Sequence, residues 1–325
     1  MSETSETDDQ AWIGVDIGGT KTAVVVAGRP PATLRRIEFP TQPQQGPEQA
    51  IERIEQAIHE VMRSTGIDRA RIGAIGVSCG GPLDQRMGVI QAPPNLDTWV
   101  DVPITAILSK EFGVACRLEN DADAGAVAEH RYGAGRGARH MVFLTMGTGL
   151  GAGIIADGRL LRGAAGQAGE IGHVRLSADG PVGYHKAGSV EGWASGGGMA
   201  RAAALEIEAA VKRGEPTELA AMAGALTAKD VAEVARRGDA VAMRIVESTG
   251  IRLGEALAIL VDLLNPERIV IGGVAMRLGE SLLGPARRSM KREALPGSAR
   301  VCQVMPASLG EAIGDVAAIC AAMGL

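Results

Sequence analysis

The stretch that decides the fold is residues 141–155, MVFLTMGTGLGAGII. A mostly apolar run enters a turn at Gly147-Thr148-Gly149, and a second apolar run follows at once. Two short strands are predicted, because no room is left between them for a helix. The turn offers backbone N–H groups that a phosphate can approach without meeting a Cβ atom.

The same pattern occurs near the start of the chain. Residues 13–26, IGVDIGGTKTAVVV, again read as strand, polar glycine turn and strand. Two matched hairpins about a domain apart predict two related lobes, each presenting a phosphate-binding turn to one cleft. An ordinary hairpin with glycine at positive φ is the alternative, and it is favoured for either turn taken alone. The matched pair, one turn carrying Asp16 and Lys21, favours phosphate binding.

Two familiar phosphate motifs do not fit these turns. Residues 147–152 match the spacing G-x-G-x-x-A of dinucleotide-binding folds, but that motif needs a helix to begin inside it. Here residues 153–155 continue as a strand. Lys21-Thr22 resembles the end of a P-loop, but Thr20 stands where that motif requires glycine.

The composition limits the class of protein. The chain has 325 residues, of which 46% are hydrophobic and only 2% aromatic, so two domains with cores of Ala, Val, Leu and Ile are expected. A net charge of −5 disfavours a nucleic-acid partner or an anionic membrane surface. No apolar run could span a membrane, the acidic N-terminus is unlike a signal peptide, and the four scattered cysteines are typical of reduced thiols. These features predict a cytoplasmic protein.

Periodicity divides the rest of the chain into alternating elements. Further strands are predicted at residues 34–39, 72–78, 114–119, 269–271 and 301–305. Helices are predicted at residues 48–65, 104–112, 122–131, 199–212, 240–264, 278–292 and 311–323.

Asn120 and Asp121 follow one of these strands, and a helix begins directly after them. Polar residues at the carboxyl end of a strand lie where α/β proteins bind ligands. Asp is also a good helix N-cap. Position alone leaves both interpretations of Asp121 open.

Five motifs together resemble the ROK family of bacterial sugar kinases and sugar-responsive repressors. They are Asp16-Ile-Gly-Gly-Thr-Lys21, Glu119-Asn-Asp121, Thr145-Met-Gly-Thr-Gly149, Ala168-Gly-Glu-Ile-Gly-His173 and Ile271-Gly-Gly273. The resemblance implies the two-lobed, ribonuclease H-like α/β fold of actin-like ATPases, of the hexokinase type, with sugar and ATP in the cleft and the last helix returning to the small lobe. The expected parts are a disordered tail at 1–10, a small lobe at 11–119 plus 309–325, and a large lobe at 120–308.

The resemblance also implies a role for each matched residue. Asp121 would be the general base that accepts the proton of the sugar hydroxyl, and Asp16 would orient Mg²⁺ through water. The implied sugar-binding residues are Gly80, Gly81, Asn95, Asn120, Glu170, His173 and Glu191. The implied ATP-binding residues are Asp16, Gly18, Gly19, Thr20, Lys21, Gly147, Thr148, Gly149, Gly272 and Gly273.

One departure from the family pattern concerns zinc. Many relatives hold a structural zinc through the motif's histidine and three cysteines, but Val182, Tyr184 and Ser189 stand at the cysteine positions here. A thiolate zinc site is therefore not expected. The loop at residues 174–190 must be ordered by other contacts.

The implied activity is an ATP-dependent hexokinase, with glucose expected as the acceptor and its 6-hydroxyl as the site of phosphorylation. The alternatives are a kinase for fructose, mannose or an N-acetylhexosamine, and a non-catalytic sugar sensor or repressor. Repressors of this family carry a winged DNA-binding domain before the kinase-like part, whereas Trp12 opens the first predicted strand after a short acidic tail. The resemblance further implies a homodimer. The sequence leaves open which hexose is used, and whether ATP or polyphosphate is the donor.

Overall fold

The structure is a computed structural model of the chain, and it describes residues 10–222 and 226–325. Apart from Gln10, the predicted tail at residues 1–10 lies outside the described residues. The chain divides into two compact units, Met1–Tyr132 with Glu311–Leu325, and Gly133–Gly310. Residues 120–132, assigned to the large lobe by the sequence, belong to the first unit.

The first unit is built on a five-stranded sheet in the order β3-β2-β1-β4-β7. Its strands are β1 (Ala11–Ile17), β2 (Lys21–Ala27), β3 (Arg35–Pro40), β4 (Ile72–Cys79) and β7 (Ala115–Asn120). The first three strands form an antiparallel meander, and β4 and β7 run parallel to β1. The predicted first hairpin is therefore confirmed.

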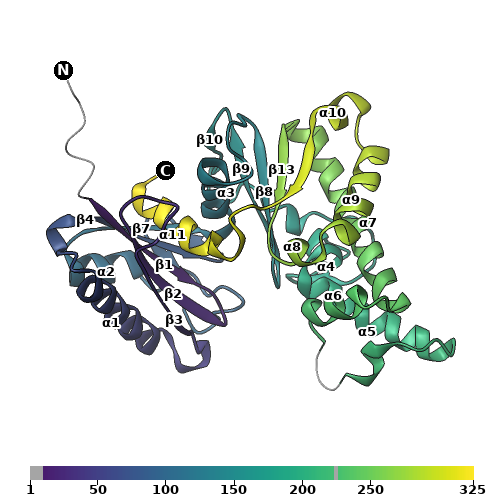
Figure 1. Ribbon diagram of the computed structural model, residues 1–325, viewed down its shortest axis with the longest axis horizontal. Helices are drawn as coiled ribbons and strands as arrows, with labels where there is room; N and C mark the ends of the chain where they lie inside the picture. Colours follow the sequence, from purple (N-terminus) through teal and green to yellow (C-terminus); the bar gives the residue numbers. More distant parts are fainter. Residues whose placement is uncertain (1–9, 223–225) are drawn as a thin grey trace. The chain divides into compact units, whose positions relative to one another are not determined.

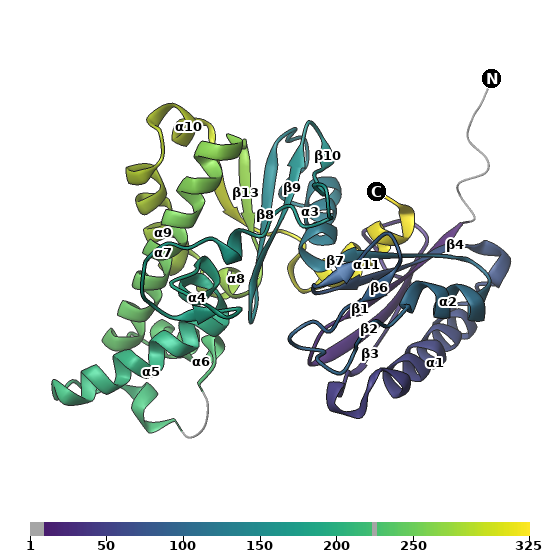
Figure 2. The same ribbon diagram turned by 180° about the vertical axis from the view of Figure 1, so that it is seen from behind.

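Helices cover both faces of this sheet (Figures 1 and 2). They are α1 (Pro47–Thr65), α2 (Ile104–Phe112), α3 (Asp121–Tyr132) and α11 (Ile313–Met323). On one face, Ile13 and Val15 share a core with Ile54 of α1. On the other face α11 packs on β1 and β4, where a Cβ atom on Gly76 would lie only 2.1 Å from the Ala322 nitrogen. The implied return of the last helix to the first lobe is confirmed.

Short elements complete the first unit. They are β5 (Leu83–Asp84), β6 (Val89–Ile90) and the single 3₁₀ turns η1 (Pro43–Gln45) and η2 (Arg69–Arg71).

The second unit has a five-stranded sheet in the order β10-β9-β8-β13-β14. Its strands are β8 (Met141–Met146), β9 (Leu150–Ala156), β10 (Arg159–Leu160), β13 (Arg268–Ile271) and β14 (Gln303–Pro306). Again three strands form an antiparallel meander and two run parallel to the first. Because the order and directions repeat those of the first unit, the prediction of two related α/β lobes is confirmed. Strand β9 continues through residues 153–155, which agrees with the rejection of a dinucleotide motif.

Helices α4 to α10 belong to the second unit. They are α4 (Val190–Ala194), α5 (Gly196–Lys212), α6 (Ala228–Arg236), α7 (Ala240–Leu264), α8 (Val274–Leu278), α9 (Glu280–Glu293) and α10 (Pro296–Val301). The short pieces are η3 (Ile171–His173), η4 (Glu218–Ala221), η5 (Gly310–Ala312, which joins the two units), β11 (Val182–Gly183) and β12 (Lys186–Ala187). The long α7 packs closely on α9, since a Cβ atom on Gly254 would lie 2.4 Å from the Ala286 carbonyl oxygen.

The structure corrects three element predictions. The helix predicted at 278–292 is α9, which begins at Glu280 after Gly279 with a φ of 52°, and the short helix α8 before it was not predicted. Helix α6 was missed, although Thr227 and Asp230 form a capping box at its start. The strand predicted at 301–305 begins at Gln303, because α10 extends to Val301. Among the described residues, none of the helices has the length and apolar character needed to cross a membrane.

Candidate functional site

The first glycine turn, between β1 and β2, is held by a threonine from outside the hairpin. The Gly18 N–H donates to the Lys21 carbonyl at 3.0 Å, and the Thr41 hydroxyl donates to the Gly18 carbonyl at 2.6 Å. Asn95 lies against the turn, because a Cβ atom on Gly19 would lie 2.5 Å from the Asn95 Cβ. The structure thus brings Asn95 to the Gly18-Gly19-Thr20 turn. Thr41 has no motif of its own and was missed.

The glycines of both turns are not explained by left-handed backbone. Gly18, Gly19, Gly147 and Gly149 all have φ outside the positive range. Apart from Gly147 and its two neighbours in the chain, no described residue has a heavy atom within 4 Å of where a Cβ on Gly147 would be. The ordinary-hairpin alternative predicted glycine at positive φ, so it does not account for these residues.

Asp16 lies near the carboxyl end of β1, opposite Ser78 of β4. It is half-buried. Desolvation raises its pKa to about 7, and repulsion from Asp121 and Asp315 adds to this effect. The Ser78 hydroxyl and the Lys21 ammonium act in the opposite direction. A cation placed beside Asp16 would relieve this unfavourable charge.

Asn120 and Asp121 lie at the next strand end, where α3 begins. The Asn120 Oδ1 accepts from the backbone N–H groups of Ala122 at 2.9 Å and Asp123 at 3.3 Å. Asn120 is therefore a cap of α3, and Asp121 adds only a 2.8 Å contact from its neighbour Ala122.

The Gly80-Gly81 turn lies beside this pair. A Cβ atom on Gly80 would lie 3.9 Å from the Asp121 Oδ2, and one on Gly81 would lie 3.5 Å from the Asn120 Nδ2. Desolvation raises the pKa of Asp121 and backbone hydrogen bonds oppose the rise, yet the residue keeps an exposed surface. Asp121 is thus an exposed residue whose carboxyl is nevertheless partly desolvated by the protein around it.

An ion-pair chain on the same sheet was not predicted. The Arg36 Nε donates to the Asp315 Oδ2 at 2.8 Å, and its Nη2 donates to Glu38 at 2.6 Å. The Lys21 Nζ donates to the same Glu38 oxygen at 2.9 Å. The ion pairs link β2, β3 and α11, and they start at Lys21, which follows the first glycine turn. No signal in the sequence joins residues so far apart.

In the second unit, the Gly147-Thr148-Gly149 turn meets the start of α5. The backbone N–H groups of Gly196 and Gly197 donate to the carbonyls of Gly147 at 2.8 Å and Thr148 at 3.1 Å. A Cβ atom on Gly196 or Gly197 would lie 2.6 Å from the carbonyl oxygen that it faces. The run of glycines that opens α5 thus lets the helix contact the turn directly.

Glu191, on α4, is also brought to this turn. Its Oε2 accepts from the Leu150 N–H at 3.1 Å, and a Cβ atom on Gly149 would lie 2.7 Å from the same oxygen. Gly172 belongs to the segment that carries Glu170 and His173, and a Cβ atom on it would lie 3.5 Å from the Glu191 Cβ. Glu170 and His173 themselves are exposed on the surface of this unit.

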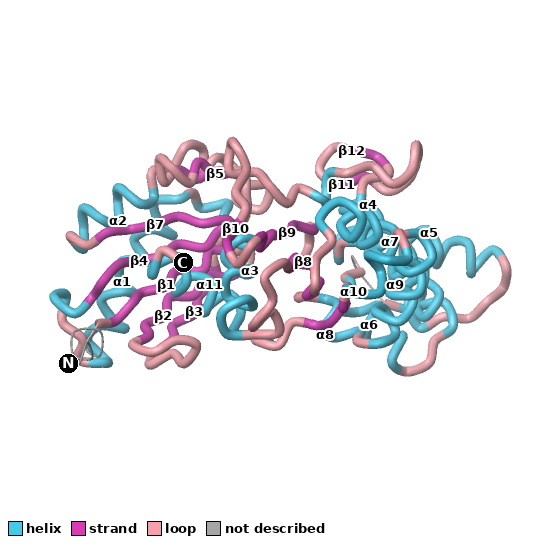
Figure 3. Tube along the Cα trace, turned by 90° about the horizontal axis from the view of Figure 1, so that it is seen from above, coloured by secondary structure: helices cyan, strands magenta, loops and turns pink. Residues whose placement is uncertain are grey.

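The loop at residues 174–190 is ordered by hydrogen bonds and aromatic contacts. The Trp193 Nε1 donates to the Ser177 Oγ at 2.8 Å, and the Arg252 guanidinium lies 4.5 Å from the Trp193 ring centre. The Arg175 Nη1 donates to the Ala187 carbonyl at 2.7 Å. The β11–β12 hairpin, next to α4 in Figure 3, contains Val182 and is closed by the positive-φ residues Tyr184 and His185.

Gly272 and Gly273 end β13 beside the second turn. The Gly272 N–H donates to the Leu144 carbonyl at 2.8 Å. Gly273 has a φ of 69°, and a Cβ atom on it would lie 2.2 Å from the Met146 carbonyl oxygen. The close packing of this segment on β8 therefore requires glycine even without a bound adenosine. It also brings the implied adenosine segment next to the Gly147 turn.

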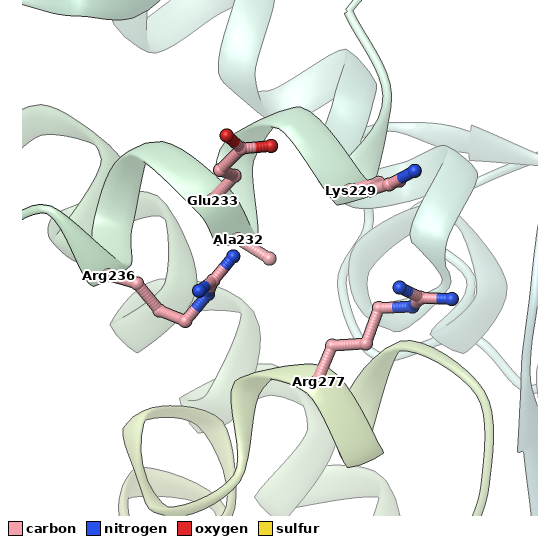
Figure 4. A pocket seen from close by; sticks show the side chains of 5 residues that line it. All are labelled: Lys229, Ala232, Glu233, Arg236 and Arg277. Atoms are coloured by element: carbon pink, nitrogen blue, oxygen red, sulfur yellow. The ribbon is translucent and has the colours of Figure 1, made fainter.

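A surface hollow of about 270 Å³ lies between α6 and α8. It is lined by Lys229, Ala232, Glu233, Arg236 and Arg277. Figure 4 shows Arg236 and Arg277 reaching from facing helices to the same hollow. Glu233, its one acidic lining residue, also accepts from Arg237 at 3.0 Å, so the hollow is positive. Helix α8 follows Gly273 directly.

Within residues 10–222 and 226–325, no three His, Cys, Asp or Glu side chains are arranged to hold a metal ion. A magnesium ion in a kinase site needs no such cage, because it keeps several waters and is held by one or two carboxylates and the phosphates. Asp16 and its neighbours fit that requirement.

Comparisons of the sequence and of the structure with known proteins point to the same family. The ROK family model matches residues 12–323. A glucokinase of Halalkalibacterium halodurans is 35% identical, over 95% of this chain and 93% of that protein. The crystal structure of a ROK family glucokinase from Streptomyces griseus, in complex with glucose and AMPPNP, is similar with a TM-score of 0.81 and 34% identity, over 97% of this chain and all of that one. A ROK hexokinase from Thermus thermophilus is similar with a TM-score of 0.76 and 33% identity, over 97% and 98% of the two chains.

Proposed function

The chain belongs to the ROK family and is a sugar kinase of the actin-like ATPase fold, and on this premise we propose that it is an ATP-dependent glucokinase acting on the 6-hydroxyl of glucose. The observation that carries the proposal is the arrangement of Asn120, Asp121 and Gly80-Gly81. It occurs in a chain that matches, over 97% of its length, a glucokinase structure containing glucose and AMPPNP.

Asp121 is the proposed general base. The 6-hydroxyl oxygen forms a bond to the γ-phosphorus, the bond from that phosphorus to the β–γ bridging oxygen breaks, and the hydroxyl proton passes to the Asp121 carboxylate. Because Asn120 already caps α3, the Asp121 carboxylate is available for this task. The proposed hydroxyl ligands of the sugar are Asn95, Asn120, Glu170, His173 and Glu191, with Gly80 and Gly81 lining the pocket.

The proposed donor is ATP with Mg²⁺. The two glycine turns would hold its phosphates through backbone N–H groups, with Lys21 near the first turn. Gly272 and Gly273 would border the adenosine. Bound Mg²⁺ supplies neutralisation of the phosphate charge, and Asp16 would orient its water shell.

We further propose that the protein is cytoplasmic and forms a homodimer. Light scattering would measure the mass of the particle in solution.

A panel of sugars tests the proposal. ADP release is measured with ATP and Mg²⁺ over glucose, mannose, fructose and N-acetylglucosamine. We expect glucose to give the highest kcat/KM, mannose to follow, and N-acetylglucosamine to be poor. A higher kcat/KM for an N-acetylhexosamine would keep the sugar kinase and reject the glucokinase. Replacing ATP with polyphosphate in the same assay tests the donor.

A further inference from the structure

Ser78 lies on the strand beside Asp16. The parallel register of β1 and β4 places the two residues directly opposite each other, and such residues point to the same face of a sheet. That face is covered by α11, where a Cβ atom on Gly314 would lie 2.1 Å from the Asp16 Oδ2. The hydroxyl of Ser78 and the carboxyl of Asp16 are therefore neighbours under the start of α11.

The Ser78 hydroxyl is buried without a hydrogen bond. Ser78 is 1% exposed, and among the residues that the structure describes its Oγ has no partner within normal hydrogen-bond geometry; the polar group opposite it is the Asp16 carboxyl, which it influences from a longer distance. A buried hydroxyl left unpaired weakens folding, whereas alanine would fill the same place without that penalty. Packing alone therefore gives no reason for a hydroxyl at this position.

The groups around Ser78 indicate the role of its hydroxyl. Ser78 is a neutral hydroxyl directly opposite the Asp16 carboxyl in the sheet register, and both lie under the start of α11. A hydroxyl can donate to a carboxylate oxygen, or accept from and donate to water. Groups that orient a metal-bound carboxylate or its water in this way strongly influence the affinity for the metal.

We propose that Ser78 is a positioning residue of the phosphoryl-transfer site, whose hydroxyl orients the Asp16 carboxylate and the water shell of a divalent cation beside it. This inference rests on the proposed function, because the cation is the one that would accompany ATP. It assigns Ser78 a role through Asp16 and not a direct contact with the sugar.

The test is Ser78→Ala, read first by calorimetry without turnover. Mg²⁺ is titrated into the full-length protein with AMPPNP and glucose, and the affinity should fall by about tenfold. The Mg²⁺ concentration for half-maximal ADP release should rise to the same extent. The free energy of unfolding should change little, because no hydrogen bond of normal geometry is lost. Ser78→Thr, which keeps the hydroxyl, should recover most of the affinity.

Ser289→Ala is the matched control. Ser289 is also 1% exposed, but it lies on α9 and accepts from the Arg292 Nη2 at 3.3 Å. It should lose some stability and keep the Mg²⁺ affinity. An unchanged Mg²⁺ affinity in Ser78→Ala would overturn the inference, whether or not the variant is also less stable. If the wild type releases no ADP with any sugar, the proposed function fails, and the calorimetric comparison still decides the role of Ser78.

Discussion

Asn120 and Asp121 are neighbours at the start of α3, and one of them caps the helix. Asn120 accepts the hydrogen bonds that cap the helix, so Asp121 is not needed for that purpose. The sequence left the two interpretations of Asp121 open, since Asp is both a good cap and a good base. The structure shows that the Asn120 amide caps the helix, and the general-base role of Asp121 stays a prediction.

Asp121→Asn should reduce kcat by about 10²- to 10⁴-fold, because an amide cannot accept the proton of the sugar hydroxyl. Glucose binding and the free energy of unfolding should change little, since Asn120 and not residue 121 caps α3 and Asn keeps the size of Asp. Steady-state kinetics and glucose titration measure both. Asp84→Asn, in a nearby turn where Asp84 accepts from the Met87 N–H at 2.9 Å, is the control. A kcat for Asp121→Asn within about tenfold of wild type would contradict the general-base role.

Asp16 should make stability depend on pH in an unusual direction. Its pKa is raised to about 7 in the folded protein, whereas an Asp in an unfolded chain titrates near 3.9. The folded state therefore holds more protons between these values, so the stability that the neutral carboxyl contributes is present below pH ~4 and lost as pH rises through about 7.

Asp16→Asn should remove this dependence. With Mg²⁺ chelated, we expect the variant to be more stable than wild type at pH 8 by about 1–2 kcal/mol, a value reduced for the partial exposure of the side chain. At pH 4 the two proteins should be nearly equal. Urea unfolding between pH 4 and 8 measures the difference. Parallel curves for the two proteins would show that Asp16 does not titrate in this range.

At the scale of elements, the hairpins and long helices were predictable and several contacts between them were not. The regular spacing of apolar residues in α7 and the two glycine turns are local patterns, which neighbouring residues in the sequence reveal. The short helix α8 was missed because five residues are too few to show a helical period. Thr41, Ser78 and Asp315 were missed because their roles depend on strands and helices that are distant in the sequence.

The ion pair that ties α11 to β3 should matter for stability. The Asp315 side chain is only 8% exposed in its pair with Arg36, so Arg36→Ala leaves a largely buried carboxylate without its partner. We expect a loss of about 1–3 kcal/mol in the free energy of unfolding. Arg139→Ala is the matched control, because its pair with Asp157 is 73% and 71% exposed and should contribute only about 0–1 kcal/mol. Equal losses in denaturant unfolding would show that burial does not strengthen the Arg36 pair.

At the scale of the whole molecule, the two units repeat one sheet topology and hold different candidate site residues. The first holds Asp16 and Asp121, and the second holds Glu191 and the Gly272-Gly273 segment. Two matched glycine turns were enough to predict this repetition, because each turn stands between the first two strands of its sheet. The identity of the hexose was not predictable, because the shape of loops decides it and no motif records that shape.

The charge of the whole chain bears on the choice between a kinase and a DNA-binding regulator. A net charge of −5 opposes association with the phosphate backbone of DNA, whereas a kinase needs positive groups only near the transferred phosphate. We therefore expect glucose-dependent ATP consumption, and no retarded band in a gel shift with mixed genomic fragments at about 50–200 mM salt, the range over which backbone binding weakens most visibly. Bovine serum albumin and a winged-helix repressor serve as the negative and positive controls. DNA binding that weakens with salt, without ATP consumption on any hexose, would assign this chain to the regulators of its family instead.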